Sequence, residues 1–254
     1  MNKRITTDIL KITAMVSMLT DHVAVAFAGF GMPAGIYWMM RCIGRLAFPI
    51  YVYFLVQGYI YTHSVGKYAI KLGLLAVISE IPYDMTVYGC FFDFRHNNVL
   101  FTLVLALLVL WATDSLYKKN RWLVPAAAVI VIWTAALSHI LGLDYSYRCI
   151  LLALIFYYAR QYEVIMYTAA AIISAISGSL ASLVTPLALV PVYFHDGKKG
   201  HIPKAVMWSF YPAHLLIIGM IRMFFLKGLG IYGEFDGLYL SLIHISEPTR
   251  LLSI

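Results

Sequence analysis

Long apolar runs separated by short polar loops fill most of the sequence. Several runs have about the 20 residues that a helix needs to cross a bilayer, whereas the sixth to eighth are shorter. Pro186 and Pro191 lie in the eighth, which predicts tilted, broken or re-entrant helices there. The pattern predicts an all-α, polytopic integral membrane protein with about nine transmembrane helices. The nine runs are residues 8–29, 35–61, 67–85, 98–113, 122–139, 149–159, 164–177, 180–194 and 205–226.

Composition favours a membrane protein over a soluble one. Hydrophobic residues make up 62% of the 254 residues and charged residues 12%, with a mean hydropathy of +0.81. One soluble core could not bury so much apolar surface. The three cysteines lack CxxC spacing, so we expect neither a redox pair nor a metal site.

The distribution of positive charge predicts an orientation. With the N-terminus in the cytoplasm, the inner loops hold ten lysines and arginines and the outer loops hold three. This positive-inside bias accounts for the net charge of +7, so we expect a lipid bilayer and no nucleic acid as partner. Residues 1–240 are expected to form one membrane domain. The stretch "SLIHISEPTRLLSI", 241–254, resembles translated sequencing adaptor and is expected to be a non-native tail.

Ionisable residues inside the apolar runs converge on one level of the predicted bilayer. At 1.5 Å per residue, His22, Arg41, Arg45, Glu80 and Asp84 all fall in its outer half. The two arginines are spaced i, i+4 and so are the two acids, so each pair shares a helix face. An isolated charge costs roughly 2.5 to 3.5 kcal/mol at mid-bilayer, which opposite charges can offset by pairing. The charged residues at this depth therefore form either a buried functional site or a purely structural ion pair, such as Arg45 with Glu80.

The presence of a histidine favours the functional interpretation, because proton transfer needs a group that titrates near neutrality and a structural ion pair does not. His22 could still be a neutral core imidazole bound to Ser17 or Thr20. His214, near Tyr211, is a second candidate. Three histidines of the inner loops are expected to be solvated: His63, His195 and His201. The outer loops add polar groups at the level of the site, among them Asn97, Asn98, Asp144 and Tyr145.

Six segments follow one another along the chain: "MVSMLTDH", "RCIGRLAFPIYVYFLVQGY", "ISEIPYD", "NNVLFTLVLALL", "LDYSYRCILL" and "FYPAHLLII". In this order they resemble the TraX family of membrane acetyltransferases. The resemblance implies a protein of the bacterial inner membrane with acetyl-CoA as donor; the family's namesake is associated with N-terminal acetylation of conjugative pilin. The family is distantly similar to acyltransferase family 3, in which an arginine precedes a first-span histidine by ten residues. Lys11 lies at about the corresponding distance before His22. A lysine there keeps the positive charge but lacks the bidentate guanidinium group of arginine.

The resemblance and the residues agree on a chemistry. Acetyl transfer needs a base for the acceptor's proton and a cation or dipole for the oxyanion. His22 would be the base, Asp21 would orient it, and Arg45 would stabilise the developing charge. Residues expected to bind or orient substrate are Arg41, Glu80, Asp84, Asn97, Asn98, Asp144, Tyr211 and His214, with Lys11 toward the donor. The acceptor stays open among pilin, peptide, glycan and lipid-linked sugar.

Two other functions fit the same residues. Intramembrane acids, arginines and histidines also occur in proton-coupled transporters and flippases, although no inverted repeat is detectable here. An assembly factor for surface structures, without chemistry of its own, is the third alternative.

Overall fold

The computed structural model describes residues 5–93, 96–141, 143, 145–176 and 180–228. Asp144 and the suspected tail 241–254 therefore lie outside the described residues. This part of the chain contains helices and no β-strand. The helices are α1 (Thr7–Phe27), α2 (Ala34–Gly44), α3 (Ala47–Tyr61), α4 (Val65–Val87), α5 (Val99–Lys119), η1 (Arg121–Leu123), α6 (Val124–Ile140), α7 (Ser146–Tyr158), α8 (Glu163–Ala175), η2 (Leu180–Ala188), α9 (Leu189–Tyr193) and α10 (Lys204–Gly228).

The predicted all-helical class is confirmed, and helices lie on each of the nine predicted runs. The second run divides into α2 and α3 at Arg45 and Leu46. The eighth run is broken, as its prolines predict, into the 3-10 helix η2 and the short α9. Four helices or helix pairs are long and apolar enough to cross a membrane: Thr7–Phe27, Ala34–Tyr61, Val99–Lys119 and Lys204–Gly228.

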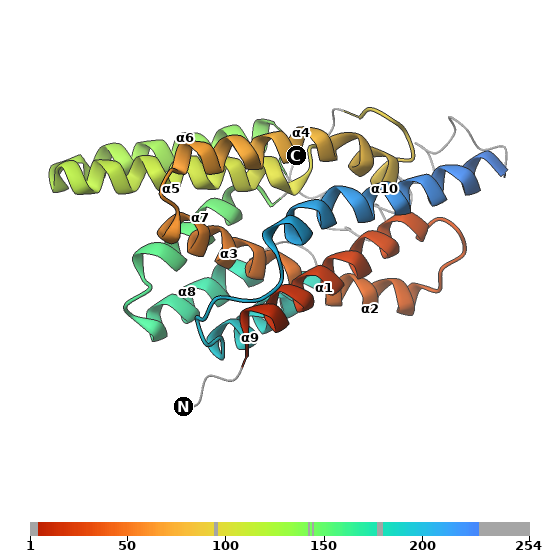
Figure 1. Ribbon diagram of the computed structural model, residues 1–254, viewed down its shortest axis with the longest axis horizontal. Coiled ribbons are helices and arrows are strands. Elements are labelled where there is room, and N and C mark those ends of the chain that lie inside the picture. Colours follow the sequence, from red (N-terminus) through yellow and green to blue (C-terminus); the bar gives the residue numbers. More distant parts are fainter. Residues whose placement is uncertain (1–4, 94–95, 142, 144, 177–179, 229–254) are drawn as a thin grey trace.

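The helices lie side by side, mostly along the long axis of the molecule (Figure 1). α10 packs against α4 and α1, α1 packs against α2 and α3, and α5 packs between α4, α6 and α7. The largest buried cluster joins α3, α4, α5, α7 and α10 through side chains such as Val52, Leu107, Leu152 and Leu215. This packing places α1, α3, α4, α5 and α10 around one volume.

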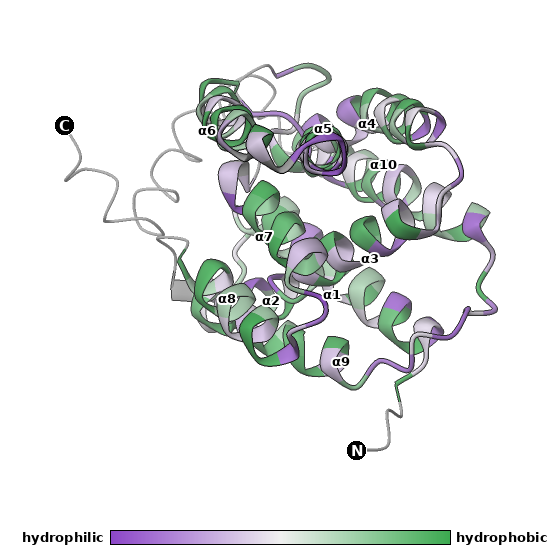
Figure 2. Cartoon of the chain, turned by 90° about the vertical axis from the view of Figure 1, so that its left-hand side faces the viewer, coloured by the Kyte–Doolittle hydropathy of each residue, from purple (hydrophilic) through white to green (hydrophobic). Residues whose placement is uncertain are grey.

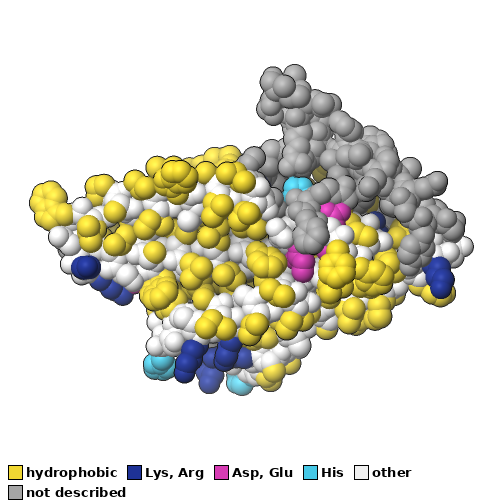
Figure 3. Space-filling view, turned by 90° about the horizontal axis from the view of Figure 1, so that it is seen from above, with side chains coloured by type: hydrophobic (Ala, Val, Ile, Leu, Met, Phe, Trp, Pro, Cys, Tyr) yellow, Lys and Arg dark blue, Asp and Glu magenta, His cyan; other side chains and the backbone are white. Residues whose placement is uncertain are grey.

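Much of the outer surface is apolar. Hydrophobic colouring covers much of α6, α7 and α8, and polar colouring concentrates in loops and at helix ends (Figure 2). Large side chains such as Trp133 (73% exposed), Val164 (81%) and Phe224 (76%) face outward. In the space-filling view, hydrophobic side chains are spread across the coloured part of the face, and Lys and Arg lie toward its edges (Figure 3). A water-soluble protein rarely exposes such a surface, so the chain is a membrane protein.

One loop prediction is wrong. His63 and His201 are exposed as expected, but His195 is buried. Its Nε2 lies 2.8 Å from Thr7 Oγ1 and its Nδ1 lies 3.0 Å from the hydroxyl of Tyr53. Sequence position placed His195 in a solvated loop, but the loop folds back onto α1, where its histidine finds two polar partners.

A carboxylate at the start of α1 holds the same loop. Asp8 accepts hydrogen bonds from the backbone N–H groups of His201, at 2.7 Å, and Ile202, at 2.9 Å. Gly200 packs directly on this carboxylate, where a Cβ would overlap it. The loop before α10 is thus attached to α1, which sets the start of α10 against the other helices.

Candidate functional site

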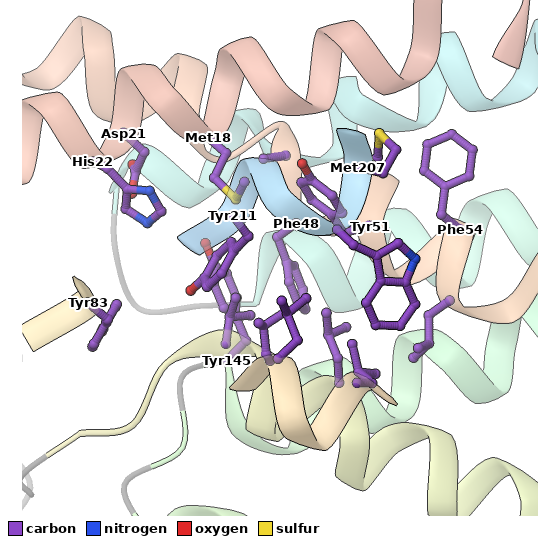
Figure 4. A pocket seen from close by; sticks show the side chains of 18 of the residues that line it. Met18, Asp21, His22, Phe48, Tyr51, Phe54, Tyr83, Tyr145, Met207 and Tyr211 are labelled. Carbon is purple, nitrogen blue, oxygen red and sulfur yellow. The ribbon is translucent and has the colours of Figure 1, made fainter. Parts of the chain in front are cut away.

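A cavity of about 190 Å³ lies between α1, α3, α4, α5 and α10. Its wall is mainly aromatic and aliphatic, and it includes the carboxylate of Asp21 and the imidazole of His22. Figure 4 shows these two at one end of the cavity and Phe54 and Met207 at the other. The site is thus an apolar space with one polar end.

His22 and His214 form a hydrogen-bonded pair at the polar end. His22 Nδ1 lies 2.7 Å from His214 Nε2, with the ring planes inclined by 23°. His214 Nδ1 lies 2.6 Å from the carbonyl oxygen of Phe210, one helical turn earlier. His214 is buried behind the cavity wall, whereas His22 lines the cavity. Two histidines distant in sequence therefore act as one unit.

The carbonyl of Phe210 determines the tautomer of both neutral rings. A carbonyl oxygen only accepts, so His214 must carry its proton on Nδ1, and its Nε2 must accept. His22 must then donate from Nδ1, which leaves its Nε2 with a lone pair. His22 is thus prepared to accept a proton at one defined nitrogen.

Asp21 is not the partner of His22, as the sequence suggested, but of Arg41. Arg41 Nη1 donates to Asp21 Oδ2 at 2.7 Å, and each side chain is 17% exposed. The two residues sit at the same depth on packed helices, as their positions along the predicted spans indicate. Gly44, on the Arg41 face of α2, makes room, since a Cβ there would overlap the Asp21 carboxylate.

Arg45 contacts the cavity through Tyr145. Its Nη1 donates to the Tyr145 hydroxyl at 3.0 Å, and the Tyr145 ring stacks on Phe48 with ring centroids 3.8 Å apart. Tyr145 adopts φ of 57°, a left-handed conformation that is uncommon for a side chain of this size. Both rings line the cavity. Arg45 thus polarises a hydroxyl on the cavity wall.

The predicted pairing of the α4 acids with the arginines is wrong. Glu80 Oε2 accepts from both the backbone N–H (3.2 Å) and the side-chain amide of Asn98. Asn98 also donates to the Ala76 carbonyl at 2.9 Å and caps α5. Asp84 is buried, and its Oδ2 accepts from the backbone N–H of Asp93 at 2.9 Å. Backbone and amide donors thus bind one oxygen of each carboxylate, because Asp93 and Asn98, which precede α5, lie against α4.

Replacing Glu80 by glutamine should therefore lower the stability of the protein more than its turnover. Half of the acceptor capacity and the charge are lost, which should reduce the free energy of unfolding by about 1–2 kcal/mol. Turnover per folded molecule should stay near the wild-type value. Denaturant titration and activity of the purified protein measure the two effects. Normal stability with slowed turnover would instead assign Glu80 to the reaction.

The remaining predicted residues divide between the site and its surroundings. Tyr211 lines the cavity edge-on to His22, with ring centroids 6.2 Å apart. Asn97 donates to the Leu141 carbonyl at 3.1 Å and thereby joins two loops. Lys11 donates to the Ile202 carbonyl at 3.3 Å, about 16 Å along α1 from His22. The structure brings Tyr211 to the site but neither Asn97 nor Lys11.

Two buried charged residues were missed. Arg222 is 1% exposed, and its Nη1 donates to the Thr86 carbonyl at 2.6 Å. Asp114 is 4% exposed and accepts from the Tyr59 hydroxyl at 2.6 Å and from Lys118 at 2.7 Å. A lone charge inside or at the end of an apolar run was the available signal. Both lie outside the cavity lining.

Within the described residues no group of three or more His, Cys, Asp or Glu side chains could hold a metal ion.

Comparisons with known proteins agree with the resemblance. The profile of the TraX protein family matches residues 6–222. The probable fimbrial assembly protein FimC, serogroup H1, of Dichelobacter nodosus is 29% identical over 241 residues, covering 85% of this chain and 95% of that protein. No solved structure gives a significant match.

Proposed function

The chain belongs to the TraX family, and from this premise we propose that it is a membrane-embedded acetyltransferase with His22 as general base. Acetyl-CoA would be the donor, and an amine or hydroxyl the acceptor. The observation that carries the proposal is the orientation of the histidine pair. A hydrogen-bond chain from the Phe210 carbonyl leaves a lone pair on Nε2 of a histidine that lines an apolar cavity.

The transfer step would use that lone pair. The acceptor's nitrogen or oxygen attacks the thioester carbonyl carbon while its proton moves to His22 Nε2. The carbon–sulfur bond then breaks, and the leaving thiolate takes up a proton from the imidazolium. His214 is a positioning residue in this scheme, because it accepts from His22 Nδ1 throughout and stabilises the charged ring.

The cationic groups would act on the charge that develops on the thioester oxygen. Arg45 makes the Tyr145 hydroxyl a stronger donor by donating to its oxygen. The Arg41–Asp21 pair would hold α1 and α2 together next to His22. Hydrogen bonds aimed at a developing oxyanion in a low-dielectric site are typically the largest contribution to catalysis.

The acceptor would be a subunit of a surface fibre or a molecule attached to one. The similarity to a protein named for fimbrial assembly supports this class, as does the TraX family itself. The name of that relative also supports a second function, that of an assembly factor without catalytic activity.

A transfer assay tests the proposal. Purified protein is incubated with acetyl-CoA labelled in the acetyl group and with membranes from cells that lack the protein. We expect label in a protein or glycan fraction, which mass spectrometry would then identify. Stable membrane insertion and fibre assembly without any transfer of label would favour the assembly factor.

The orientation would place the N-terminus in the cytoplasm, with about nine spans in the bacterial inner membrane. We predict that residues 195–204 face the cytoplasm and residues 86–97 face outward, because of the ten-to-three bias of basic residues. Cysteines placed at the exposed positions Lys199 and Phe92, in a chain without native cysteines, test this. An impermeant reagent should label only position 92 in intact cells. Labelling at both positions would reject the nine-span arrangement.

A further inference from the structure

A groove of about 410 Å³ lies between α8 and the segment formed by η2 and α9. α8 and α9 pack against each other at one edge of the molecule (Figure 1). Glu163, Tyr167 and Ala171 line the groove at intervals of four residues, so one face of α8 forms that wall. Pro186 and Phe194 mark the two ends of the opposite wall. No residue of the groove lines the cavity beside the histidine pair, so the two are separate sites.

One end of the groove is polar and aromatic, and the other end is apolar. Glu163 is the first residue of α8 and Tyr193 is the last of α9, so both lie at the end next to the loops. Ala171 and Pro186 line the other end. Glu163 and Ala171 are about 12 Å apart along α8, at 1.5 Å per residue. One leaflet contributes about 15 Å of hydrocarbon, half of the bilayer core. The groove therefore has the length and the order of polarity of one lipid molecule, whereas a partner helix that crossed the membrane would contact both leaflets.

Two tyrosines and a carboxylate meet at the loop end. The rings of Tyr167 and Tyr193 contact edge-to-face, with centroids 5.2 Å apart and planes inclined by 78°. Glu163 is exposed and lies one helical turn before Tyr167 on the same face of α8. Aromatic rings attract an ammonium group through cation–π interactions, and a carboxylate attracts it through charge-assisted hydrogen bonds. The carboxylate would repel an anionic headgroup, so the chemistry of this end suits a cationic amine.

Lipid can reach the groove from the side. Val164 lines it and is exposed, as are the neighbouring side chains of Ile165 and Leu187. In a membrane protein such a surface faces hydrocarbon. A lipid molecule can therefore enter the groove by lateral movement in the bilayer.

We infer that the groove binds a phospholipid with a primary ammonium headgroup, of which phosphatidylethanolamine is the simplest. The ammonium lies against Glu163 and the rings of Tyr167 and Tyr193, and one acyl chain runs past Val190 toward Pro186. The phosphate lies at the level of the loops that precede α8 and follow α9. This site is additional to the transfer reaction and does not depend on it.

Native mass spectrometry of the full chain in detergent tests the inference. The protein is titrated with dioleoylphosphatidylethanolamine or dioleoylphosphatidylglycerol, which have the same acyl chains. We expect the first lipid to bind about tenfold more tightly, because its ammonium gains a charge-assisted hydrogen bond. Glu163→Gln should weaken its binding about tenfold and abolish the preference, whereas Glu163→Asp keeps the charge and should keep the preference. Glu163 is exposed, so neither change should disturb folding.

Substitutions of tyrosine test the aromatic part of the site. Tyr167→Leu with Tyr193→Leu keeps an apolar groove without the rings and should weaken binding of phosphatidylethanolamine by about three- to tenfold. Tyr162→Leu is the matched control and should bind as the wild type does, because this exposed tyrosine precedes Glu163 but does not line the groove.

Three results would overturn the inference. Equal binding of the two lipids would mean that the groove accepts hydrocarbon without recognising a headgroup. Selective binding of phosphatidylethanolamine that Glu163→Gln leaves unchanged would place the lipid elsewhere on the protein. A dimer that Glu163→Gln dissociates, without any lipid preference, would assign the groove to a second copy of the chain.

Discussion

Replacing His22 by alanine should reduce acetyl transfer by about 10² to 10⁴, the usual effect of removing a general base. Acetyl-CoA binding should stay within about tenfold of the wild-type value, because contacts with the phosphates and the adenine of the donor would lie elsewhere. His22→Gln should behave similarly, since an amide can form a hydrogen bond but cannot carry the proton away. Single-turnover transfer at saturating donor and acceptor measures the effect.

Variants of His214 separate a positioning role from a merely structural one. His214→Gln keeps an oxygen that can accept from His22 Nδ1, so it should retain more transfer than His214→Ala at equal protein level. His63→Ala, at an exposed loop position, is the control and should have wild-type rates. Near wild-type transfer in His22→Ala would show that His22 is a structural core histidine and not the base. His214 would then be the next candidate base to test.

Replacing Arg41 by glutamine should lower the free energy of unfolding by about 2–4 kcal/mol. The change leaves Asp21 with its charge in a mostly buried position, and an unpaired buried charge is far more costly than a pair. Asp21 Oδ2 has Arg41 as its ion-pair partner, and Gly44 packs closely on the same carboxylate. Titration with SDS, followed by tryptophan fluorescence, measures the loss.

A double-mutant cycle shows whether the pair itself is responsible. Asp21→Asn with Arg41→Gln removes both charges and keeps hydrogen-bonding groups, so it should be more stable than Arg41→Gln alone by at least about 1 kcal/mol. Lys119→Gln removes an exposed charge and should change stability little. Additive losses in the double variant would mean that the two side chains contribute independently, contrary to the 2.7 Å contact.

The apolar runs placed the helices correctly, because helix formation by an apolar run depends on local sequence. A run of apolar residues forms a helix in lipid wherever it occurs, and prolines broke the run at 180–194 as expected. Depth also follows from the sequence, since the rise per residue is constant. That is why Asp21 and Arg41, predicted at one level, meet in the structure.

Partners around the site could not be predicted, because depth does not say which helix faces which. Glu80 and Arg45 were placed at one level, yet Glu80 binds Asn98 and Arg45 binds Tyr145. His195 shows the same limit, because a loop position said nothing about the fold of that loop onto Thr7.

Sequence alone identified the helical membrane class, the TraX resemblance and His22 as a candidate base, since each depends on residue types and on spacing within one segment. Tertiary packing alone brought His214 to His22 across most of the chain, and with it the hydrogen-bond chain that leaves His22 Nε2 open. It also formed the cavity, whose wall combines residues of several helices. A side chain's chemistry is encoded at its own position, whereas its partner is selected by helix packing that involves the whole chain.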